Sequence, residues 1–232
     1  MDNRSVVSSQ SRISESSFIS RVYLWMSLGL GVSGLASFWL LAQPQLLKVV
    51  FTNNLLLIGL IAAEFGLVVW LSVAALRMSS GLASAVFLGY SFLNGITLTS
   101  VFLVYTGASV LSTFFITAGT FLFFSIYGAT THKDLTSIGS LAMMGLFGVI
   151  IASLVNIFLK SSTLMWITTF IGIAVFLGLI AYDTQKLKNI HAMGFEGVGT
   201  QKKVAILGAL TLYLDFINLF VLLLRLFGRR RD

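Results

Sequence analysis

The chain alternates between long apolar runs and short polar connections. Seven runs reach the length of about 20 residues that an α-helix needs to cross a bilayer. The pattern therefore predicts an all-α integral membrane protein with seven transmembrane helices. The runs cover Val22–Ala42, Asn54–Leu76, Leu82–Tyr105, Ser109–Ala129, Ile138–Leu159, Thr163–Tyr182 and Val204–Leu224.

The segments outside these runs suggest a simple domain organisation. Residues 1–21 are polar and rich in serine, which predicts a disordered N-terminal tail. Residues 22–228 form one membrane domain, and residues 229–232 form a basic C-terminal tail. The only proline, Pro44, follows the first run, where a helix stop is expected.

The composition fits a protein that uses lipid as its solvent. Hydrophobic side chains make up 57% of the 232 residues and charged ones 10%, whereas soluble domains are about 45–50% apolar and about 25% charged. The chain has no cysteine, which excludes a disulfide framework and a thiolate metal site. The sequence has no HExxH, GxSxG, P-loop or dinucleotide motif. We therefore expect neither an enzyme nor a bound cofactor.

The net charge of +7 is better explained by topology than by a nucleic-acid partner, because no basic patch with interleaved aromatic residues is present. Lys and Arg are retained on the cytoplasmic side of membranes. If the N-terminus is cytoplasmic, only Lys48 and Lys160 lie outside before the last helix. The basic residues on the inside are then Arg4, Arg12, Arg21, Arg77, Lys133, Lys186, Lys188, Lys202 and Lys203. This asymmetry predicts a cytoplasmic N-terminus.

The basic C-terminus does not fit this topology. Seven full spans would place Arg225 and the run Arg229–Arg231 on the outside. Either the last helix crosses the membrane and violates the rule, or it is re-entrant and returns to the inside.

Three acidic residues fall within or at the edges of the predicted spans: Glu64, Asp183 and Asp215. No Lys or Arg falls in the middle of any span, so buried salt bridges cannot account for all three. An ionisable side chain at membrane depth is costly and usually functional. These acids must be protonated, share protons, form an ion pair with an arginine at the end of a span, or face water.

The pattern of polar residues in the last predicted span indicates the direction in which Asp215 points. On a helical wheel one sector, about 100° wide, carries its polar and small residues, which predicts that this sector faces the protein interior. Thr211 and Asn218 are suited to hydrogen bonds between helices. Burying the carboxyl group of Asp215 costs more free energy than burying an asparagine that could make similar bonds, which favours a functional role for Asp215. The sector contains Gly208, Thr211, Asp215, Asn218 and Arg225.

Asp183 ends the sixth predicted span. Alone it could be an ordinary interface residue. Beside Asp215 the two carboxyl groups cannot both ionise cheaply, so the pair shares a proton and titrates as a unit. When deprotonated, the pair offers oxygen ligands suited to a transient hard cation such as Ca²⁺. We therefore predict a proton-operated latch beside an ion path.

Three segments resemble the signatures of the transmembrane Bax-inhibitor-motif family, especially of its bacterial members. They are "AYDTQKLK" at Ala181–Lys188, "LYLDFINLF" at Leu212–Phe220 and "NGITL" at Asn94–Leu98. The resemblance covers about residues 20–228. It implies seven helices, six of them surrounding a central C-terminal helix, which makes Val204–Leu224 the core helix.

The resemblance also implies a function and site residues. The family's aspartate pair matches Asp183 and Asp215, and the basic residue that closes its second helix and can latch onto the first aspartate matches Arg77. Family members mediate a pH-sensitive calcium leak. Eukaryotic members protect against cell death, and some bacterial members interact with a membrane-bound protease. Glu64 misses the family's glutamate position by about two residues, so no family role is carried onto it.

We therefore expect a pH-sensitive calcium leak channel in the bacterial inner membrane, with calcium and protons as its ions and a monomeric state. Asp183 and Asp215 are the expected pH-sensing pair and transient calcium ligands, and Arg77 is the latch. Two alternatives stay open: a proton-coupled transporter, and a non-transporting regulator that interacts with a membrane protease or the cell-death machinery. Further candidate pore-lining or helix-packing residues are Glu64, Asn94, Thr211 and Asn218.

Overall fold

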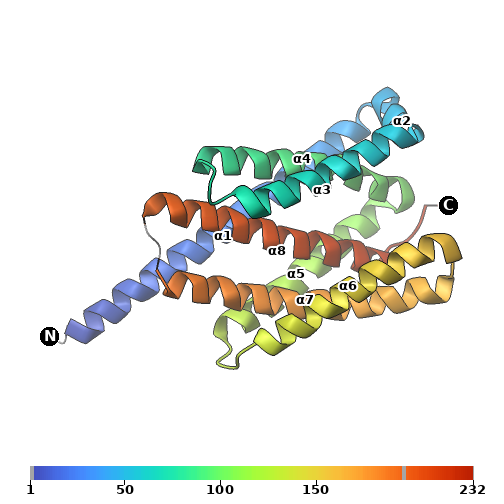
Figure 1. Ribbon diagram of the computed structural model, residues 1–232. Helices are drawn as coiled ribbons and strands as arrows, with labels where there is room; N and C mark the ends of the chain where they lie inside the picture. Colours follow the sequence, from blue (N-terminus) through green and yellow to red (C-terminus); the bar gives the residue numbers. More distant parts are fainter. Residues whose placement is uncertain (1–2, 195–196, 232) are drawn as a thin grey trace. The chain divides into compact units, whose positions relative to one another are not determined.

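The computed structural model describes residues 3–194 and 197–231, where the regular elements are eight α-helices (Figure 1). All but α2 are long and apolar enough to cross a bilayer. The described residues include no strand, only an isolated β-bridge between Tyr105 and Arg230. The predicted all-α fold with seven spans is confirmed. The helices are α1 (Asn3–Leu41), α2 (Pro44–Thr52), α3 (Asn54–Ala74), α4 (Ser80–Val104), α5 (Gly107–Thr130), α6 (Thr136–Leu159), α7 (Ser162–Ala192) and α8 (Val198–Phe227).

Helix α1 begins well before the first predicted span. The sequence predicts a disordered tail over residues 1–21, whereas the chain is helical from Asn3, and the stretch able to cross the bilayer starts at Ser17. The first glycine of the chain is Gly29, and no proline precedes it. A polar segment without helix breakers can continue the helix that follows it. The helix bounds thus include most of the segment predicted as a tail, and the disorder of this segment stays a prediction.

Pro44 starts a helix as well as following one. The connection predicted at Gln43–Asn53 contains the short helix α2, with Pro44 in its first turn. Proline suits this position because its missing N–H would have no partner there in any helix. The side chain of Asn53 then accepts hydrogen bonds from the backbone N–H groups of Leu55 and Leu56, at 3.0 and 3.3 Å, and caps the start of α3.

Helix α7 extends beyond the end predicted for the sixth span. The prediction ended that span at Tyr182, but α7 continues to Ala192, so Asp183 lies inside a helix. No glycine or proline follows Asp183 until Gly194. Gly194 and Gly197 have φ values of +84° and +86°. Glycine adopts this left-handed region at no steric cost, and these two residues form the turn into α8.

The helices form two compact units that share α8. The first unit comprises the chain up to Leu103 together with Asn189–Tyr213, and the second comprises Val104–Lys188 together with the chain from Leu214 onward. In the apolar stretch of α8, 61% of the residues are buried, against 6% in α3 and in α6. The expectation that the C-terminal helix is the buried one is confirmed, while the single domain at 22–228 stays a prediction.

In the first unit α8 packs against α4 through Tyr213, which is fully buried. Its ring meets Phe87 and Tyr90 of α4 edge to face, with centroids 5.9 and 5.7 Å apart. Helices α1 and α4 also approach closely, because a Cβ atom at Gly95 would collide with the backbone of Ser33. These contacts fix the N-terminal half of α8 against α4 and fix α4 against α1.

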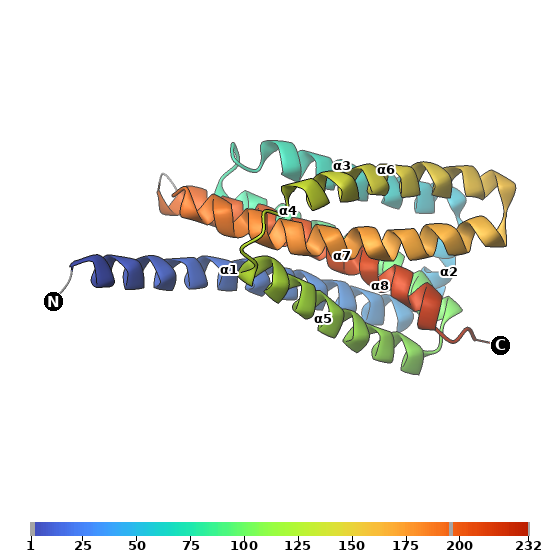
Figure 2. The same ribbon diagram turned by 90° about the horizontal axis from the view of Figure 1, so that it is seen from below.

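In the second unit α8 packs against α5 and α7. The ring of Phe216 lies between Phe114 and Phe121 of α5, at centroid distances of 5.5 and 5.6 Å. Gly172 of α7 leaves room for the side chain of Leu222. Helices α6 and α7 run antiparallel and side by side, as Figures 1 and 2 show. The C-terminal half of α8 therefore has its own set of neighbours.

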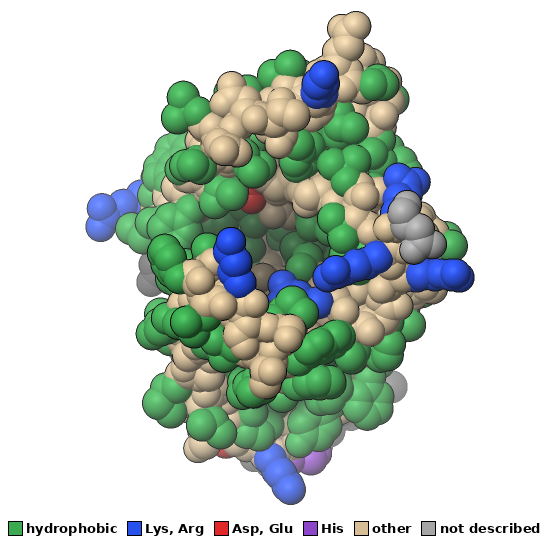
Figure 3. Space-filling model, turned by 90° about the vertical axis from the view of Figure 1, so that its right-hand side faces the viewer, with side chains coloured by type: hydrophobic (Ala, Val, Ile, Leu, Met, Phe, Trp, Pro, Cys, Tyr) green, Lys and Arg blue, Asp and Glu red, His purple; other side chains and the backbone are tan. Residues whose placement is uncertain are grey.

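The outward surfaces of α3 and α6 are apolar. Leu55 of α3 is 80% exposed and Phe158 of α6 is 85% exposed. In Figure 3, hydrophobic side chains lie mainly along the outline of the molecule, whereas several Lys and Arg side chains lie around the central hollow. Soluble proteins rarely expose such extensive apolar surface, and it fits contact with lipid tails.

The C-terminal end of α8 lies beside the connection between α4 and α5. The backbone N–H of Thr106 donates to the carbonyl of Arg229, and that of Arg231 donates to the carbonyl of Val104, both at 2.9 Å. Because α5, α6 and α7 run alternately, the α6–α7 connection lies at this end too. Helix α8 is one continuous helix that is long enough to cross a bilayer, which favours the crossing over the re-entrant alternative.

Candidate functional site: an aspartate pair

The structure brings Asp183 of α7 and Asp215 of α8 together within the second unit. Their carboxyl groups lie close enough for each to act electrostatically on the other. An ionised carboxylate can only accept hydrogen bonds, so a bond between two carboxyl groups requires a proton on one of them. Two carboxyl groups this close to each other are therefore expected to hold a proton between them.

The two carboxyl groups have different surroundings. Asp215 is 5% exposed, and its Oδ2 atom is buried without a hydrogen-bond partner in the described part of the chain. Asp183 is half-buried, and the positive charge of Lys186 acts on it from the next turn of α7. A charge is least costly where water and an opposite charge are near. These surroundings favour the negative charge on Asp183 and the proton on Asp215.

The neighbours of Asp183 in the "YDTQ" segment fix this part of α7. The ring of Tyr182 covers Gly139 of α6 so closely that a Cβ atom there would collide with it. The hydroxyl group of Thr184 lies 3.1 Å from that of Ser125 on α5. Each of these side chains attaches α7 to a different helix of the unit, which positions Asp183.

Gln185 holds the connection between α5 and α6. Its Oε1 accepts a hydrogen bond from the backbone N–H of Leu135 at 2.9 Å, and its Nε2 donates to the carbonyl of Lys133 at 2.8 Å. One turn further along α7, the Nζ of Lys188 donates to the carbonyl of Ala129 at 2.9 Å. The segment around Asp183 is thus tied to its neighbours along two helical turns.

Arg77, the predicted latch, lies in the turn after α3. Its side chain is exposed, and its backbone N–H donates to the carbonyl of Ala74 at 2.9 Å. Arg77 belongs to the first unit and Asp183 to the second. The latch between them stays a prediction.

Glu64 of α3 belongs to a separate polar cluster in the first unit. Its two carboxylate oxygens accept hydrogen bonds from Asn94 at 3.2 Å and from Thr97 at 2.9 Å, both on α4. The hydroxyl group of Tyr213 donates to Asn94 at 2.9 Å and lies 2.7 Å from that of Ser33 on α1. Glu64 thus faces protein, and the cluster links four helices.

Sequence reasoning found only part of this cluster. It selected Glu64 and Asn94 but omitted Ser33, Thr97 and Tyr213. The position of Tyr213, two residues before Asp215 in a buried helix, was the available signal, because a buried tyrosine usually has a partner for its hydroxyl group.

Asn94→Ala is expected to lower the free energy of unfolding by about 1–2 kcal/mol, because it removes the amide that connects Glu64 with Tyr213. Asn218→Ala is the matched control. The amide of Asn218 donates to the carbonyl of Leu214 in its own helix, at 2.7 Å, and we expect a smaller change. Thermal unfolding of the two purified variants in detergent measures the difference, and equal losses would contradict a connecting role for Asn94.

Thr211 and Asn218 differ from the interhelical role that the wheel suggested. Thr211 donates to the carbonyl of Leu207 at 3.2 Å, and Asn218 donates to that of Leu214. Both carbonyls belong to α8 itself. Such bonds to the preceding turn are a common alternative for polar side chains inside helices.

The aspartate pair suits a passing cation better than a resident one. Calcium ions take six to eight oxygen ligands in stable protein sites, and two carboxyl groups supply at most four. Within residues 3–194 and 197–231 there is no cluster of three or more His, Cys, Asp or Glu that could hold a metal ion.

The fold and the buried acids define a multi-span membrane protein with a titratable pair in its interior. Comparison with known proteins assigns its family. Residues 15–232 match the family described as "Inhibitor of apoptosis-promoting Bax1". The chain belongs to this family, the Bax inhibitor-1 family.

Curated bacterial relatives match along nearly their whole length. The chain is 47% identical over 223 residues to "Inner membrane protein YbhL" of Escherichia coli, covering 96% of this chain and 95% of the relative. It is 43% identical to an uncharacterized protein of Borreliella burgdorferi, with 93% of each chain covered. An uncharacterized membrane protein of Streptococcus pyogenes is 33% identical, with 98% and 99% covered.

Proposed function

We propose that this protein is a pH-sensitive calcium leak channel of the bacterial inner membrane, gated by the proton that Asp183 and Asp215 share. The observation that carries the proposal is the close approach of these two carboxyl groups in the interior of the second unit, where each acts electrostatically on the other. A carboxyl pair with this geometry responds to pH as a unit. The membrane location is supported by the name of the Escherichia coli relative.

Loss of the shared proton would open the path. Two adjacent carboxylates repel each other by about 4 kcal/mol at a separation near 4 Å and an effective dielectric constant of 20. Repulsion between Asp183 on α7 and Asp215 on α8 favours separation of the two helices. Separation admits water, which stabilises both charges and leaves oxygen ligands facing the path. Deprotonation therefore favours the open form, and protonation favours the closed form.

A proton-coupled transporter is the second candidate function. It would use the same acids to carry protons against a substrate. Transporter sites of this kind are commonly built from discontinuous helices, whereas α7 and α8 are each continuous through the aspartate positions. This continuity favours a leak channel.

Calcium flux into liposomes tests the proposed function. The purified protein is reconstituted into vesicles with a trapped calcium indicator, and uptake is measured across a pH series on both sides of neutrality. We expect uptake that rises with pH and that empty vesicles lack. Absence of protein-dependent uptake at every pH would reject the channel and leave the non-transporting regulator.

Arg77→Ala is expected to shift the pH midpoint of this flux while leaving stability within about 0.5 kcal/mol, because the side chain is exposed. The physical reason is that a cation able to reach Asp183 would favour its ionised form. Arg21→Ala, another exposed arginine of the first unit, is the control and should leave the midpoint in place. An unchanged flux and midpoint in Arg77→Ala would identify Arg77 as an ordinary residue of the membrane interface.

A further inference from the structure

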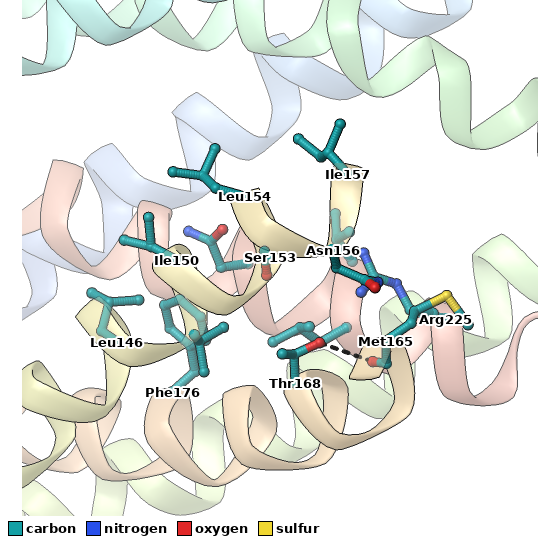
Figure 4. Close-up of a pocket in the computed structure, with 14 residues that line it drawn as sticks. Leu146, Ile150, Ser153, Leu154, Asn156, Ile157, Met165, Thr168, Phe176 and Arg225 are labelled. Carbon is teal, nitrogen blue, oxygen red and sulfur yellow. Dashed lines mark hydrogen bonds between the residues drawn. The ribbon is translucent and has the colours of Figure 1, made fainter. Parts of the chain in front are cut away.

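The second unit contains a cavity that the aspartate pair does not line. Its volume is about 620 Å³, and its walls come from α6, α7 and α8 (Figure 4). This size falls within the range of about 300–1,000 Å³ that is usual for small-molecule sites. The cavity is therefore large enough to hold a substantial apolar group.

The cavity walls are mostly apolar, and Arg225, the charged lining residue, lies toward one end. The cavity is also lined by the neutral polar residues Ser153, Thr168 and Asn218. Figure 4 shows Leu146, Ile150 and Phe176 toward the opposite end, and Asn156 beside Arg225 at the polar end. A site with this division matches a ligand that has an apolar chain and a polar head. The guanidinium group fixes the sign of that head as negative.

Arg225 has no acidic partner in this site. Its Nη1 atom donates to the hydroxyl group of Thr169 at 3.3 Å, which is a neutral acceptor. The residues that line the cavity include neither Asp nor Glu. A guanidinium group has five N–H donors that fit the oxygens of phosphate. The site therefore carries a positive charge that an anionic group would neutralise.

The polar end of the cavity lies at one boundary of the membrane. Asn156 is close to the end of α6, and Arg225 is close to the end of α8. Lys160 and Arg229–Arg231 lie at the same end of this unit and are exposed. These are the basic residues that the positive-inside rule does not explain. Contact with anionic lipid headgroups would account for their position.

Lipid can reach the cavity from the side. Only 6% of the apolar stretch of α6 is buried. Two residues of α6 that line the cavity, Leu154 and Ile157, are 56% and 64% exposed. A chain from the surrounding bilayer can therefore enter between α6 and the other walls without passing through water.

We propose that this cavity holds an acyl chain of an anionic phospholipid from the adjacent leaflet, with the phosphate group on Arg225. The apolar wall takes the chain, and the guanidinium group takes the head. A zwitterionic phospholipid carries a second, positive group and gains less from Arg225. The proposal is independent of the leak-channel function, since the cavity contains neither aspartate.

Titration of the purified whole chain with single lipids, read by native mass spectrometry, tests the proposal. The lipids are phosphatidylglycerol, phosphatidylcholine and, as a free fatty acid, oleate. We expect phosphatidylglycerol to bind at least fivefold more tightly than phosphatidylcholine. Arg225→Gln should weaken phosphatidylglycerol binding by about fivefold, as expected for one basic residue worth about 1 kcal/mol, and should leave phosphatidylcholine unchanged.

Lys160→Gln is the matched control, because it removes an exposed positive charge at the same end without altering the cavity, and it should have little effect. Ser153→Phe fills the cavity from α6 and should weaken both phospholipids even if Arg225→Gln does not fold. Equal binding of the two phospholipids by the unaltered protein, or unchanged phosphatidylglycerol binding in Ser153→Phe, would overturn the proposal. Equal losses in Lys160→Gln and Arg225→Gln would indicate diffuse surface charge instead. Binding of oleate with exclusion of phosphatidylglycerol would reject the phospholipid as the occupant.

Discussion

Asp183→Asn and Asp215→Asn are each expected to shift or abolish the pH midpoint of calcium flux. Either substitution keeps the size and most of the hydrogen-bonding capacity of the side chain but removes one of the two titrating groups. The remaining carboxyl group then has an amide neighbour and responds to pH as a single acid. The flux midpoint therefore changes even where the fold is intact.

The double variant separates a coupled pair from two independent acids. If the two carboxyl groups share one proton, the second substitution has no pair left to break, and the effect of the double variant on flux should be smaller than the sum of the two single effects. Asp134→Asn is the control, since Asp134 is exposed before α6 and accepts a hydrogen bond from the backbone N–H of Thr136 at 2.9 Å. Its flux midpoint should match that of the unaltered protein. Additive shifts in the double variant would show that the two aspartates titrate independently.

Gly128→Leu is expected to destabilise the protein by about 3 kcal/mol or more and to reduce its flux. Gly128 lies on α5 where a Cβ atom would collide with the backbone of Ala181 on α7. A backbone cannot move aside as a flexible side chain can, so the helices must separate. Ala181 is two residues from Asp183, and the displacement therefore reaches the aspartate pair.

Gly119→Leu provides the comparison on the same helix. A Cβ atom at Gly119 meets no other atom within 4 Å, and the larger side chain should extend into lipid. Thermal unfolding and flux of the two variants are measured side by side. If Gly128→Leu is as stable as Gly119→Leu, the close contact between α5 and α7 is not required for the fold.

The length of the apolar runs was the strongest signal for the fold. A segment that crosses the bilayer must satisfy its backbone hydrogen bonds internally and therefore forms a helix. The same physics made Asp215 recognisable, since a carboxyl group amid apolar residues is costly without a special environment. Its partner was harder to identify. Asp183 lies where the apolar run ends, and only the continuation of α7 to Ala192 places it inside a helix beside Asp215.

Other features depended on contacts between segments far apart in the chain. The cluster around Glu64 joins Ser33, Asn94 and Tyr213 from three other helices, and no periodicity within one helix specifies it. The position of α8 beside residues 104–106 was equally hidden, because charge counting left both a crossing and a re-entrant helix open. The helix bounds of residues 3–21 were hard to predict for a different reason, since polar composition weakens a tertiary core but does not by itself break a helix.

The central claim is that a proton shared by Asp183 and Asp215 controls the leak. Infrared difference spectroscopy of the reconstituted protein follows protonated carboxyl groups across a pH series, and calcium uptake is recorded on the same vesicles. The account predicts one carboxyl signal that disappears with the same pH midpoint at which uptake rises, and loss of this coincidence in Asp215→Asn. A carboxyl signal that titrates where uptake is constant, or pH-dependent uptake that is unchanged in Asp215→Asn, would contradict it.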